Sequence, residues 1–320
     1  MQAARTLLVA ATGGHLEELY RIHRRFSPPS GSMTWVTHDD PQSRSLLAGE
    51  VVEHVDYVPP RGYSALLRIL PQANRIVRDG RFDRVVSTGA GIALPFFLAA
   101  RARGVPCHYI ESAARADGPS LTGSLASRIP GTRLYSQYQS WAGSRWSYRG
   151  SLFDDFDVTE APDGPVRRVV VTLGTMRTFE FGRLVDRLVT VLPEVVEPGA
   201  EILWQLGATS SRPPFGDVRT GVPHAELRSA IAAADLVVTH AGIGSALTAL
   251  ELGRRPVLVP RLSSHDEHVD DHQLMIADEL GERGLAVSVG ADLLEAGDLR
   301  RAVRGRVATE ARPSSFTLVD

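Results

Sequence analysis

The chain has 320 residues, a hydrophobic fraction of 43% and a net charge of −2 at pH 7. This length is enough for two domains of ordinary size, and the apolar content supports a packed core in each. The near-neutral balance gives no reason to expect nucleic-acid binding, although residues 1–153 alone hold 18 Arg against 11 acidic residues.

Apolar segments with strand-like and helix-like periodicity alternate through the first half of the chain. In order, the expected elements are a strand at 6–11, a helix at 16–25, strands at 33–37 and 51–55, a helix at 63–77 interrupted by Pro71, a strand at 85–87, a helix at 92–102 and a strand at 107–110. Such alternation is typical of a parallel sheet with helices on both faces.

An acidic stretch rich in Pro and Gly, residues 154–165, has the composition of a linker. The alternation then restarts, with expected strands at 168–173, 201–205, 236–238, 256–259 and 285–287, and expected helices at 179–192, 225–233, 246–252 and 273–280. We therefore predict an α/β protein of two doubly wound, Rossmann-like domains, 1–153 and 166–320. A ligand should lie at the carboxyl ends of the strands, in a cleft between the domains.

Two glycine-rich turns in the second half each follow an apolar strand and open a helix. One turn contains His240, Gly242, Gly244 and Ser245, and the other contains Gly174, Thr175 and Arg177. A turn of this kind presents backbone N–H groups to an anion, and Arg177 can neutralise the anion's charge. We interpret the two turns together as a diphosphate site.

Similar turns occur in the first half. They contain Gly13, Gly14 and His15 in one case, and Thr88 and Gly89 in the other. An imidazole at the start of a helix can accept a proton from a sugar hydroxyl, which makes His15 a candidate base. Glu111, directly after the strand at 107–110, is the second candidate base. An ion pair with one of the many Arg residues is an equally good interpretation of Glu111.

A polar loop after the strand at 256–259 holds Arg261 and the run Asp270, Asp271, His272 and Gln273. The run looks like a metal site, but a carboxylate and a histidine adjacent in sequence make a poor chelate. We interpret His272 and Gln273 as partners of sugar hydroxyls, and Asp266, Glu267 and His268 as residues that shape the loop. We therefore expect no metal and no cofactor.

Arg and apolar residues are mixed in 61–84 and again in 141–149. Each stretch could rest on an anionic membrane surface, or could be packed on its sheet with a solvated Arg face. The single Cys107 excludes an intrachain disulfide, and the longest apolar run, 92–100, is well short of the ~20 residues that span a bilayer. We expect a cytoplasmic protein, free or peripheral at the inner face of the cell membrane.

These motifs, in this order, resemble those of family 28 glycosyltransferases. The second half resembles the C-terminal domain of the family at 173–175, 240–245, 259–261 and 271–273. The first half resembles the partner subunit of the two-subunit asparagine-linked glycosylation UDP-GlcNAc transferase at 13–15, 87–89, 109–112 and 120–123. The chain thus looks like a fusion of the two subunits, and is similar to bacterial exopolysaccharide glycosyltransferases.

The resemblance implies the GT-B fold and metal-independent, inverting transfer from a UDP-sugar of the GlcNAc, glucose or glucuronate type. It implies a polyprenyl-diphosphate-linked or other lipid-linked acceptor, in polysaccharide or glycolipid biosynthesis. By position, Gly242, Gly244 and Ser245 face the donor diphosphate, and His272 and Gln273 face its sugar. His15 takes the place of the base, and Pro223 and His224 fall where the family's backbone reads uracil.

One position departs from the family pattern. The family commonly has a carboxylate three positions after Ser245 that holds the ribose, and this chain has Thr248 there. Glu251 lies one helical turn further, on the same face, and can replace it.

Three other functions stay open. They are a UDP-GlcNAc 2-epimerase-like isomerase on the same fold, a glycosyltransferase for a soluble natural product, and a non-catalytic protein that binds nucleotide sugars. An epimerase would convert UDP-GlcNAc without any acceptor, and a binding protein would turn nothing over.

Overall fold

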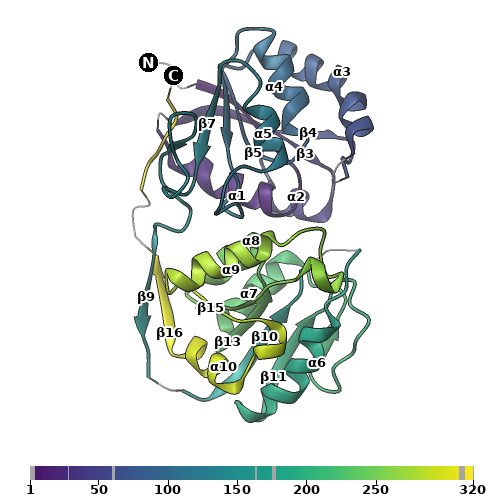
Figure 1. Ribbon diagram of the computed structural model, residues 1–320. Coiled ribbons are helices and arrows are strands. Elements are labelled where there is room, and N and C mark those ends of the chain that lie inside the picture. Colours follow the sequence, from purple (N-terminus) through teal and green to yellow (C-terminus); the bar gives the residue numbers. More distant parts are fainter. Residues whose placement is uncertain are drawn as a thin grey trace. The chain divides into compact units, whose positions relative to one another are not determined.

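The computed structural model describes residues 4–27, 29–59, 62–162, 164–174, 178–309 and 314–319. The chain forms two compact units: unit 1 comprises residues 1–154 and 313–320, and unit 2 comprises residues 155–312. Each unit is built on a parallel sheet with helices packed on both faces (Figure 1). This confirms the α/β, Rossmann-like fold that the alternation predicted.

Unit 1 has a sheet of seven parallel strands. In spatial order they are β4 (Val52–Val55), β3 (Ser30–His38), β1 (Ala4–Ala10), β5 (Arg84–Gly89), β6 (Cys107–Ile110), β7 (Thr132–Ser136) and β8 (Ser147–Tyr148). The helices of unit 1 are α1 (Gly14–Ile22), α2 (Pro41–Leu46), α3 (Tyr63–Gly80), α4 (Ala93–Arg101) and α5 (Leu121–Ala126). Because the strands are parallel, the turns after β1, β5 and β6 lie along one edge of the sheet.

The two faces of this sheet are covered by different helices. On one face, Leu7 of β1 shares a buried cluster with Ile69 of α3 and Phe96 of α4. Strand side chains alternate between the faces. The other face carries α1, whose Tyr20 ring lies 6.1 Å from the ring of Trp35 in β3.

Helix α3 continues through Pro71 to Gly80, whereas we expected an interruption at the proline. Pro71 has no N–H to bond to the carbonyl of Leu67 one turn earlier. Leu67 is 72% exposed, so water can satisfy that carbonyl and the helix continues.

Unit 2 repeats the design with six parallel strands. In spatial order they are β12 (Asp217–Arg219), β11 (Val196–Gln205), β10 (Val166–Thr172), β13 (Leu236–His240), β14 (Val257–Val259) and β15 (Val287–Ser288). Its helices are α6 (Gly182–Val191), α7 (His224–Ala233), α8 (Ile243–Glu251), α9 (His272–Glu282) and α10 (Ala296–Val303). Helices α6 and α10 cover one face, and α7 and α8 cover the other.

The stretch 154–165, expected to be a linker, contains a strand. β9 (Phe156–Glu160) pairs antiparallel with β16 (Gly305–Thr309). Phe156 is buried and Asp157 is exposed, which is the alternation of a strand. The acidic composition concealed this pattern.

We expected the C-terminal residues to belong to the second domain, 166–320. In the structure the described residues 314–319 belong to unit 1. β17 (Phe316–Thr317) pairs in parallel with β2 (Phe26–Ser27). The ring of Phe316 is fully buried and lies 5.5 Å from the ring of Tyr135. Arg25 Nε donates to the carbonyl of Ser314 at 2.8 Å, which fixes the start of this tail.

None of the helices in the described residues has both the length and the apolar character that crossing a bilayer requires.

Candidate active site

The two glycine turns of unit 2 meet around the imidazole of His240. Gly174 follows β10, while His240 is the last residue of β13 and Gly242 follows it. A Cβ at Gly242 would overlap His240 Nε2, and a Cβ at Gly174 would lie 2.6 Å from His240 Cε1. Gly174 also has a φ of +78°, which favours glycine. Glycine at both positions therefore lets the two turns close on one ring.

His240 is a neutral packing group rather than a cation. Burial, together with the positive charge of Arg261, lowers its pKa to about 3. Its Nδ1 lies 3.3 Å from the hydroxyl of Thr239 and 3.5 Å from the carbonyl of Thr172. The imidazole thus links the ends of β10 and β13 and brings no charge to the site.

The N-terminus of α8 offers hydrogen-bond donors at this edge of the sheet. Ala246 is the first residue whose N–H bonds within the helix, to Gly242 at 3.0 Å. Within the described part of the chain, the N–H groups of Ile243, Gly244 and Ser245 have no protein partner. Such a helix start is a favourable place for a phosphate.

Arg261 is not placed for the direct donor contact that we expected. Its side chain is 1% exposed, and burial lowers its pKa to about 10. It donates to the carbonyls of Leu173 at 2.9 Å, Phe179 at 3.1 Å and Glu180 at 2.9 Å. Arg261 therefore holds both ends of the turn that follows β10.

Thr175 and Arg177 lie outside the described residues, but their flanks are well anchored. Gln205 Nε2 donates to the carbonyl of Gly174 at 3.3 Å, and the N–H of Phe181 donates to the Thr209 hydroxyl at 3.0 Å. Neither Gln205 nor Thr209 was predicted from the sequence. Gln205 ends β11, and this place at the carboxyl end of a strand was the available signal.

Gln273 is also turned inward. It is 2% exposed, and its Oε1 accepts from the N–H of Arg261 at 3.1 Å. We expected it to face a sugar, but in this structure it holds the loop between β14 and α9. His272, the first residue of α9, keeps 24% of its side chain exposed.

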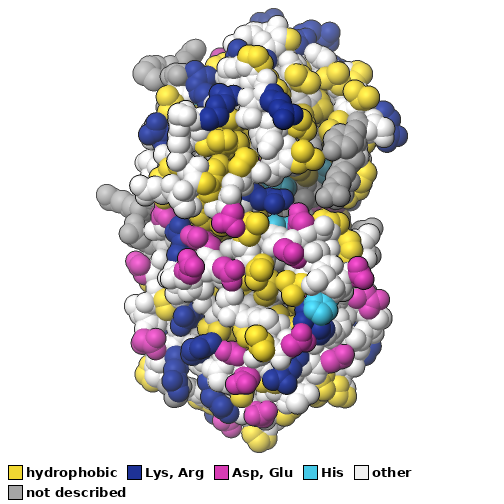
Figure 2. All heavy atoms as spheres, in the orientation of Figure 1, with side chains coloured by type: hydrophobic (Ala, Val, Ile, Leu, Met, Phe, Trp, Pro, Cys, Tyr) yellow, Lys and Arg dark blue, Asp and Glu magenta, His cyan; other side chains and the backbone are white. Residues whose placement is uncertain are grey.

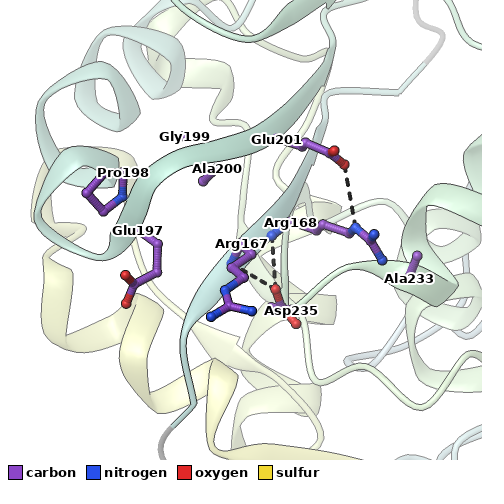
Figure 3. Close-up of a pocket in the computed structure, with 9 residues that line it drawn as sticks. All are labelled: Arg167, Arg168, Glu197, Pro198, Gly199, Ala200, Glu201, Ala233 and Asp235. Atoms are coloured by element: carbon purple, nitrogen blue, oxygen red, sulfur yellow. Dashed lines mark hydrogen bonds and ion pairs between the residues drawn. The ribbon is translucent and has the colours of Figure 1, made fainter.

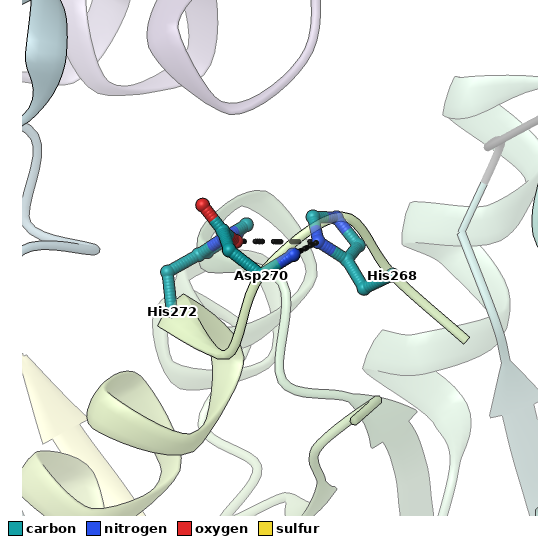
Figure 4. A group of neighbouring side chains, drawn as sticks. All are labelled: His268, Asp270 and His272. Atoms are coloured by element: carbon teal, nitrogen blue, oxygen red, sulfur yellow. Dashed lines mark hydrogen bonds and ion pairs between the residues drawn. The ribbon is translucent and has the colours of Figure 1, made fainter. Parts of the chain in front are cut away.

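Three side chains of this loop, those of His268, Asp270 and His272, converge, although we expected the loop to hold no metal site. His268 Nδ1 and His272 Nδ1 both point at one carboxylate oxygen of Asp270 (Figure 4). His268 Nδ1 is 3.4 Å from that oxygen, and His272 Nδ1 is hydrogen-bonded to it. The cluster was not predicted from the sequence because its members are not adjacent but alternate along the chain, at 268, 270 and 272.

The residues assigned to the nucleoside lie on α7 and α8. Pro223 is exposed at the N-cap of α7, and His224 is the first residue of that helix.

The two candidates for the ribose differ in what they contact. The hydroxyl of Thr248 is nearly buried and donates to the carbonyl of Gly244 at 2.8 Å. Glu251 ends α8, is 27% exposed and pairs with Arg228 of α7 at 3.3 Å.

In unit 1, His15 is locked against the second glycine turn. Its Nδ1 lies 2.9 Å from the carbonyl of Thr88, and the Thr88 hydroxyl donates to the carbonyl of His15 at 2.7 Å. A Cβ at Gly89 would lie 3.1 Å from His15 Cε1, and Gly89 has a φ of +118°. The turns after β1 and β5 therefore fix the imidazole, while His15 itself stays half-buried.

The first glycine turn is closed by Gln42, a residue that was not predicted from the sequence. The N–H of Gly13 donates to Gln42 Oε1 at 2.6 Å, and Gln42 Nε2 donates back to the carbonyl of Gly13 at 3.3 Å. Gly14 begins α1 directly after this pair. The N–H of Gly13 is thus occupied by the protein itself.

Glu111 is fully buried and holds a loop. Its carboxylate accepts from the N–H of Ser120 at 2.9 Å and from the N–H of Ser112 at 3.2 Å. Burial raises the pKa of Glu111. With 0% exposure, the carboxylate does not reach a ligand in this conformation.

A second buried carboxylate, Glu18, lies beside Glu111. It accepts from the Ser112 hydroxyl at 2.6 Å, from the N–H of Ala113 at 2.8 Å and from Gln137 Nε2 at 3.1 Å. Burial, with a smaller contribution from the charge of Glu111, raises the pKa of Glu18 to about 7. Through these hydrogen bonds, the two carboxylates connect α1, the segment that follows β6 and Gln137, the residue after β7.

Unit 2 also has a cavity of about 550 Å³ at the opposite end of its sheet, where β10 begins (Figure 3). Asp235 accepts from the N–H groups of Arg167 at 2.8 Å and Arg168 at 2.9 Å, and Arg168 pairs with Glu201 at 3.5 Å. Ligands of open α/β sheets bind at the carboxyl ends of the strands. This cavity is therefore not our candidate site.

The charged surface differs between the units. On the face drawn in Figure 2, the charged side chains over unit 1 are mostly Arg, while unit 2 shows both signs. This agrees with 18 Arg against 11 acidic residues in 1–153. Leu67, Tyr57 and Val51 of unit 1 are 72%, 65% and 63% exposed.

Comparison with known proteins places these features in a family context. The model of the glycosyltransferase family 28 C-terminal domain matches residues 170–301, which include both glycine turns of unit 2. The UDP-N-acetylglucosamine--N-acetylmuramyl-(pentapeptide) pyrophosphoryl-undecaprenol N-acetylglucosamine transferase of Shewanella amazonensis is 27% identical over 319 residues, covering 90% of this chain and 85% of the relative. The enzyme of the same name from Pseudomonas savastanoi is 28% identical over 313 residues, covering 89% and 84%.

Solved structures show the same fold. MurG of Acinetobacter baumannii superposes with a TM-score of 0.59 at 19% identity, covering 93% of this chain and 88% of that one. The glycosyltransferase SnogD of Streptomyces nogalater has a TM-score of 0.59 at 21% identity, covering 94% and 90%. A putative UDP-N-acetylglucosamine 2-epimerase from Listeria monocytogenes reaches 0.59 at 9% identity, covering 94% and 91%.

Proposed function

Because the chain is a family 28 glycosyltransferase with the GT-B fold, we propose that it transfers a sugar from a UDP-sugar to a lipid-linked acceptor, with inversion at the anomeric carbon. The observation that carries this proposal is the closure of two glycine turns on His240 beside the N-terminus of α8. This arrangement lies inside the region that matches the family model.

The donor diphosphate binds at the carboxyl edge of the sheet in unit 2. The N–H groups of Ile243, Gly244 and Ser245 contact it, and Arg177 neutralises it. These donors stabilise the negative charge that develops on the departing UDP, which is the task that a metal performs in other transferases. We therefore expect transfer without a metal ion.

His15 of unit 1 is the proposed general base. It takes the proton of the acceptor hydroxyl while that oxygen forms the new glycosidic bond and the bond from the anomeric carbon to UDP breaks. His15 is preferred over Glu111 because Glu111 is fully buried and occupied by the backbone of Ser112 and Ser120. Glu111 acts as a positioning residue.

Several contacts with the rest of the donor belong to the same proposal. Pro223 and His224 read the base at the start of α7, Glu251 holds the ribose, and His272 meets the sugar. These side chains each have exposed surface, whereas Gln273 and Arg261 act through the loops that they hold.

The acceptor is proposed to carry a polyprenyl diphosphate. The relatives at 27% and 28% identity are named for transfer to a pyrophosphoryl-undecaprenol substrate. An enzyme that uses such an acceptor must work at a membrane surface. Unit 1 has an excess of Arg and exposes the apolar side chains of Leu67, Tyr57 and Val51, which are the residue types that suit contact with an anionic headgroup layer. We therefore place the protein in the cytoplasm, peripheral at the inner face of the cell membrane.

The decisive experiment combines donor and acceptor panels. UDP-GlcNAc, UDP-glucose and UDP-glucuronate are first ranked by their effect on the melting temperature, since a ligand of the native state raises it. The best donor is then incubated with undecaprenyl-diphosphate-linked sugars, and products are identified by mass spectrometry. Transfer that survives EDTA supports the proposal; loss on chelation that Mg²⁺ restores contradicts the metal-independent step.

Two controls test the rival functions. Incubation with UDP-GlcNAc alone reports an epimerase, because that reaction needs no acceptor. Soluble aglycones in place of the lipid report a natural-product transferase. Conversion in either control without lipid-linked transfer would overturn the proposed acceptor.

A further inference from the structure

The strongest unassigned cluster in the described chain is formed by His268, Asp270 and His272. One ligand atom from each residue lies within 4.8 Å of the other two. The two imidazole rings are 4.6 Å apart and nearly perpendicular, at 80°, so their Nδ1 atoms approach the carboxylate from different directions (Figure 4). Both imidazole nitrogens face the same carboxylate oxygen, so the three ligand atoms are close enough together for one ion to bind all of them in place of these contacts.

The loop holds these side chains in place before any ion binds. The ring of His268 is buried and stacks on Phe179, with centroids 6.0 Å apart. Glu267, just before it, accepts from the N–H of Leu262 at 3.1 Å and pairs with Arg183 at 3.0 Å. Binding an ion therefore requires little ordering of the backbone.

The end of the cluster that enters α9 is also fixed. Asp271 accepts from the N–H of Ser263 at 2.8 Å, and His272 begins the helix. Asp270 and His272 keep 36% and 24% of their side chains exposed, which leaves a path from solvent. The site is therefore both anchored and open on one side.

The distances suit a transition-metal ion. In a tetrahedral site with bonds of about 2.1 Å, neighbouring ligand atoms lie about 3.4 Å apart. His268 Nδ1 is 3.4 Å from Asp270 Oδ1, while the closer contact from His272 is a hydrogen bond whose proton an ion would replace. The N–H of Asp270, 3.4 Å from His268 Nδ1, makes only a weak bond there that an ion can also replace.

We propose that His268, Asp270 and His272 bind one divalent transition-metal ion, with Zn²⁺ as the best match. Two imidazole nitrogens and one carboxylate oxygen are ligands that Zn²⁺ prefers, and three protein ligands leave a fourth position for water. The site differs from our expectation of no metal, and it is not the source of the charge stabilisation in transfer.

A consequence for catalysis rests on the proposed function. His272 is the side chain proposed to meet the donor sugar, so an ion that engages His272 prevents that contact. Zn²⁺ should therefore raise the KM for the UDP-sugar and leave kcat unchanged. The site would make the enzyme sensitive to free transition metal without making it metal-dependent.

The binding test uses the full chain and needs no activity. Calorimetry with Zn²⁺ should show one ion per chain, and Co²⁺ should give the visible absorption of a four-coordinate site. Asp270→Asn and His272→Gln should each lower the Zn²⁺ affinity by about tenfold or more. The matched controls in the same loop, Asp271→Asn and His265→Gln, should bind as the wild type does.

The outcomes distinguish the binding of the metal ion from its proposed effect on the donor KM. Absence of a stoichiometric ion, or equal affinity in wild type and Asp270→Asn, overturns the metal site. Binding without any rise in the donor KM overturns the inhibitory consequence and the sugar contact of His272, and leaves the site standing. Failure of the transfer assay itself would contradict the proposed function, while calorimetry would still report on the ion.

Discussion

Arg261 and Leu173 are 88 positions apart, yet Arg261 Nη2 donates to the carbonyl of Leu173 at 2.9 Å. The same guanidinium reaches Phe179 and Glu180 beyond the turn. One buried side chain that follows β14 thus holds the residues on both sides of the turn proposed to bind the diphosphate.

Arg261→Lys should weaken UDP binding about tenfold and lower the melting temperature. A lysine keeps the charge but cannot reach three carbonyls, and each buried group left unpaired costs ~1–3 kcal/mol. Calorimetry with UDP and a thermal melt give the two values. The control is Arg168→Lys, at an exposed position at the other end of β10, which should change neither the UDP affinity nor the melting temperature. If Arg261→Lys binds UDP as tightly as the wild type, Arg261 does not support the donor site.

Gly242→Ala should reduce UDP affinity by about tenfold or more, because its methyl group overlaps the ring of His240. The ring is held on the other side by Gly174, so relief requires the turn itself to move. Gly297→Ala in α10, where a Cβ meets nothing within 4 Å, is the matched control. Equal UDP affinity in Gly242→Ala and wild type would show that the turn does not contact the diphosphate.

His15→Ala should lower kcat by about 10²–10⁴-fold with UDP affinity and melting temperature near those of the wild type. Glu111→Ala should instead lower the melting temperature strongly, because the N–H groups of Ser112 and Ser120 lose their hydrogen-bond acceptor in the interior. Steady-state kinetics, calorimetry and thermal melts distinguish the two. Most of the activity surviving in His15→Ala would leave the base unassigned.

The buried carboxyl of Glu18 makes the free energy of unfolding depend on pH. Its pKa rises from 4.5 in the unfolded chain to about 7 in the native state, so the native state retains a proton that the unfolded state releases. The free energy of unfolding therefore falls as pH rises from about 4.5 to 7, by about 3 kcal/mol from this residue.

Glu18→Gln should remove this part of the pH dependence and be more stable than wild type at pH 8. The amide can accept from Ala113 and Gln137 and donate to the Ser112 hydroxyl. Urea unfolding at pH 5 and pH 8 measures the difference between the two proteins. Parallel pH profiles for the variant and the wild type would contradict the assignment.

Glu251→Gln should raise the donor KM more than Thr248→Ala does. Glu251 has exposed carboxylate, whereas the Thr248 hydroxyl is engaged by Gly244. Arg228→Gln breaks the same ion pair from the other side, so it separates loss of the pair from loss of a ribose contact. A larger effect from Thr248→Ala would mean that the position equivalent to the family's carboxylate still holds the ribose.

The glycine turns were predictable from the sequence because the pattern that identifies them lies within a few consecutive residues. Each follows an apolar strand, and parallel strands bring their carboxyl ends to one edge. That rule placed Gly174 and Gly242 in the same region, but it gave no indication that they would share the ring of His240. The contact depends on side-chain packing between strands that are far apart in the chain.

The direction of buried polar side chains was not predictable. Arg261 and Gln273 were interpreted as ligand contacts because they lie in a polar loop that follows the strand at 256–259. In the structure they point inward and satisfy backbone groups of loops that only the tertiary fold brings together. The cluster of His268, Asp270 and His272 escaped for a related reason, since its geometry depends on bends that composition does not reveal.

The short tail of residues 314–319 has a consequence for how the protein is made. Phe316 completes the packing around Phe26 and Tyr135 in unit 1, but it follows the whole of unit 2 in the chain. During synthesis, the apolar surface of unit 1 around Phe26 and Tyr135 therefore stays uncovered until the whole of unit 2 has been made. Recombination between relatives faces the same constraint: a chimera that exchanges unit 1 as a single N-terminal block leaves its final strand behind, and two crossovers are needed to move the unit intact.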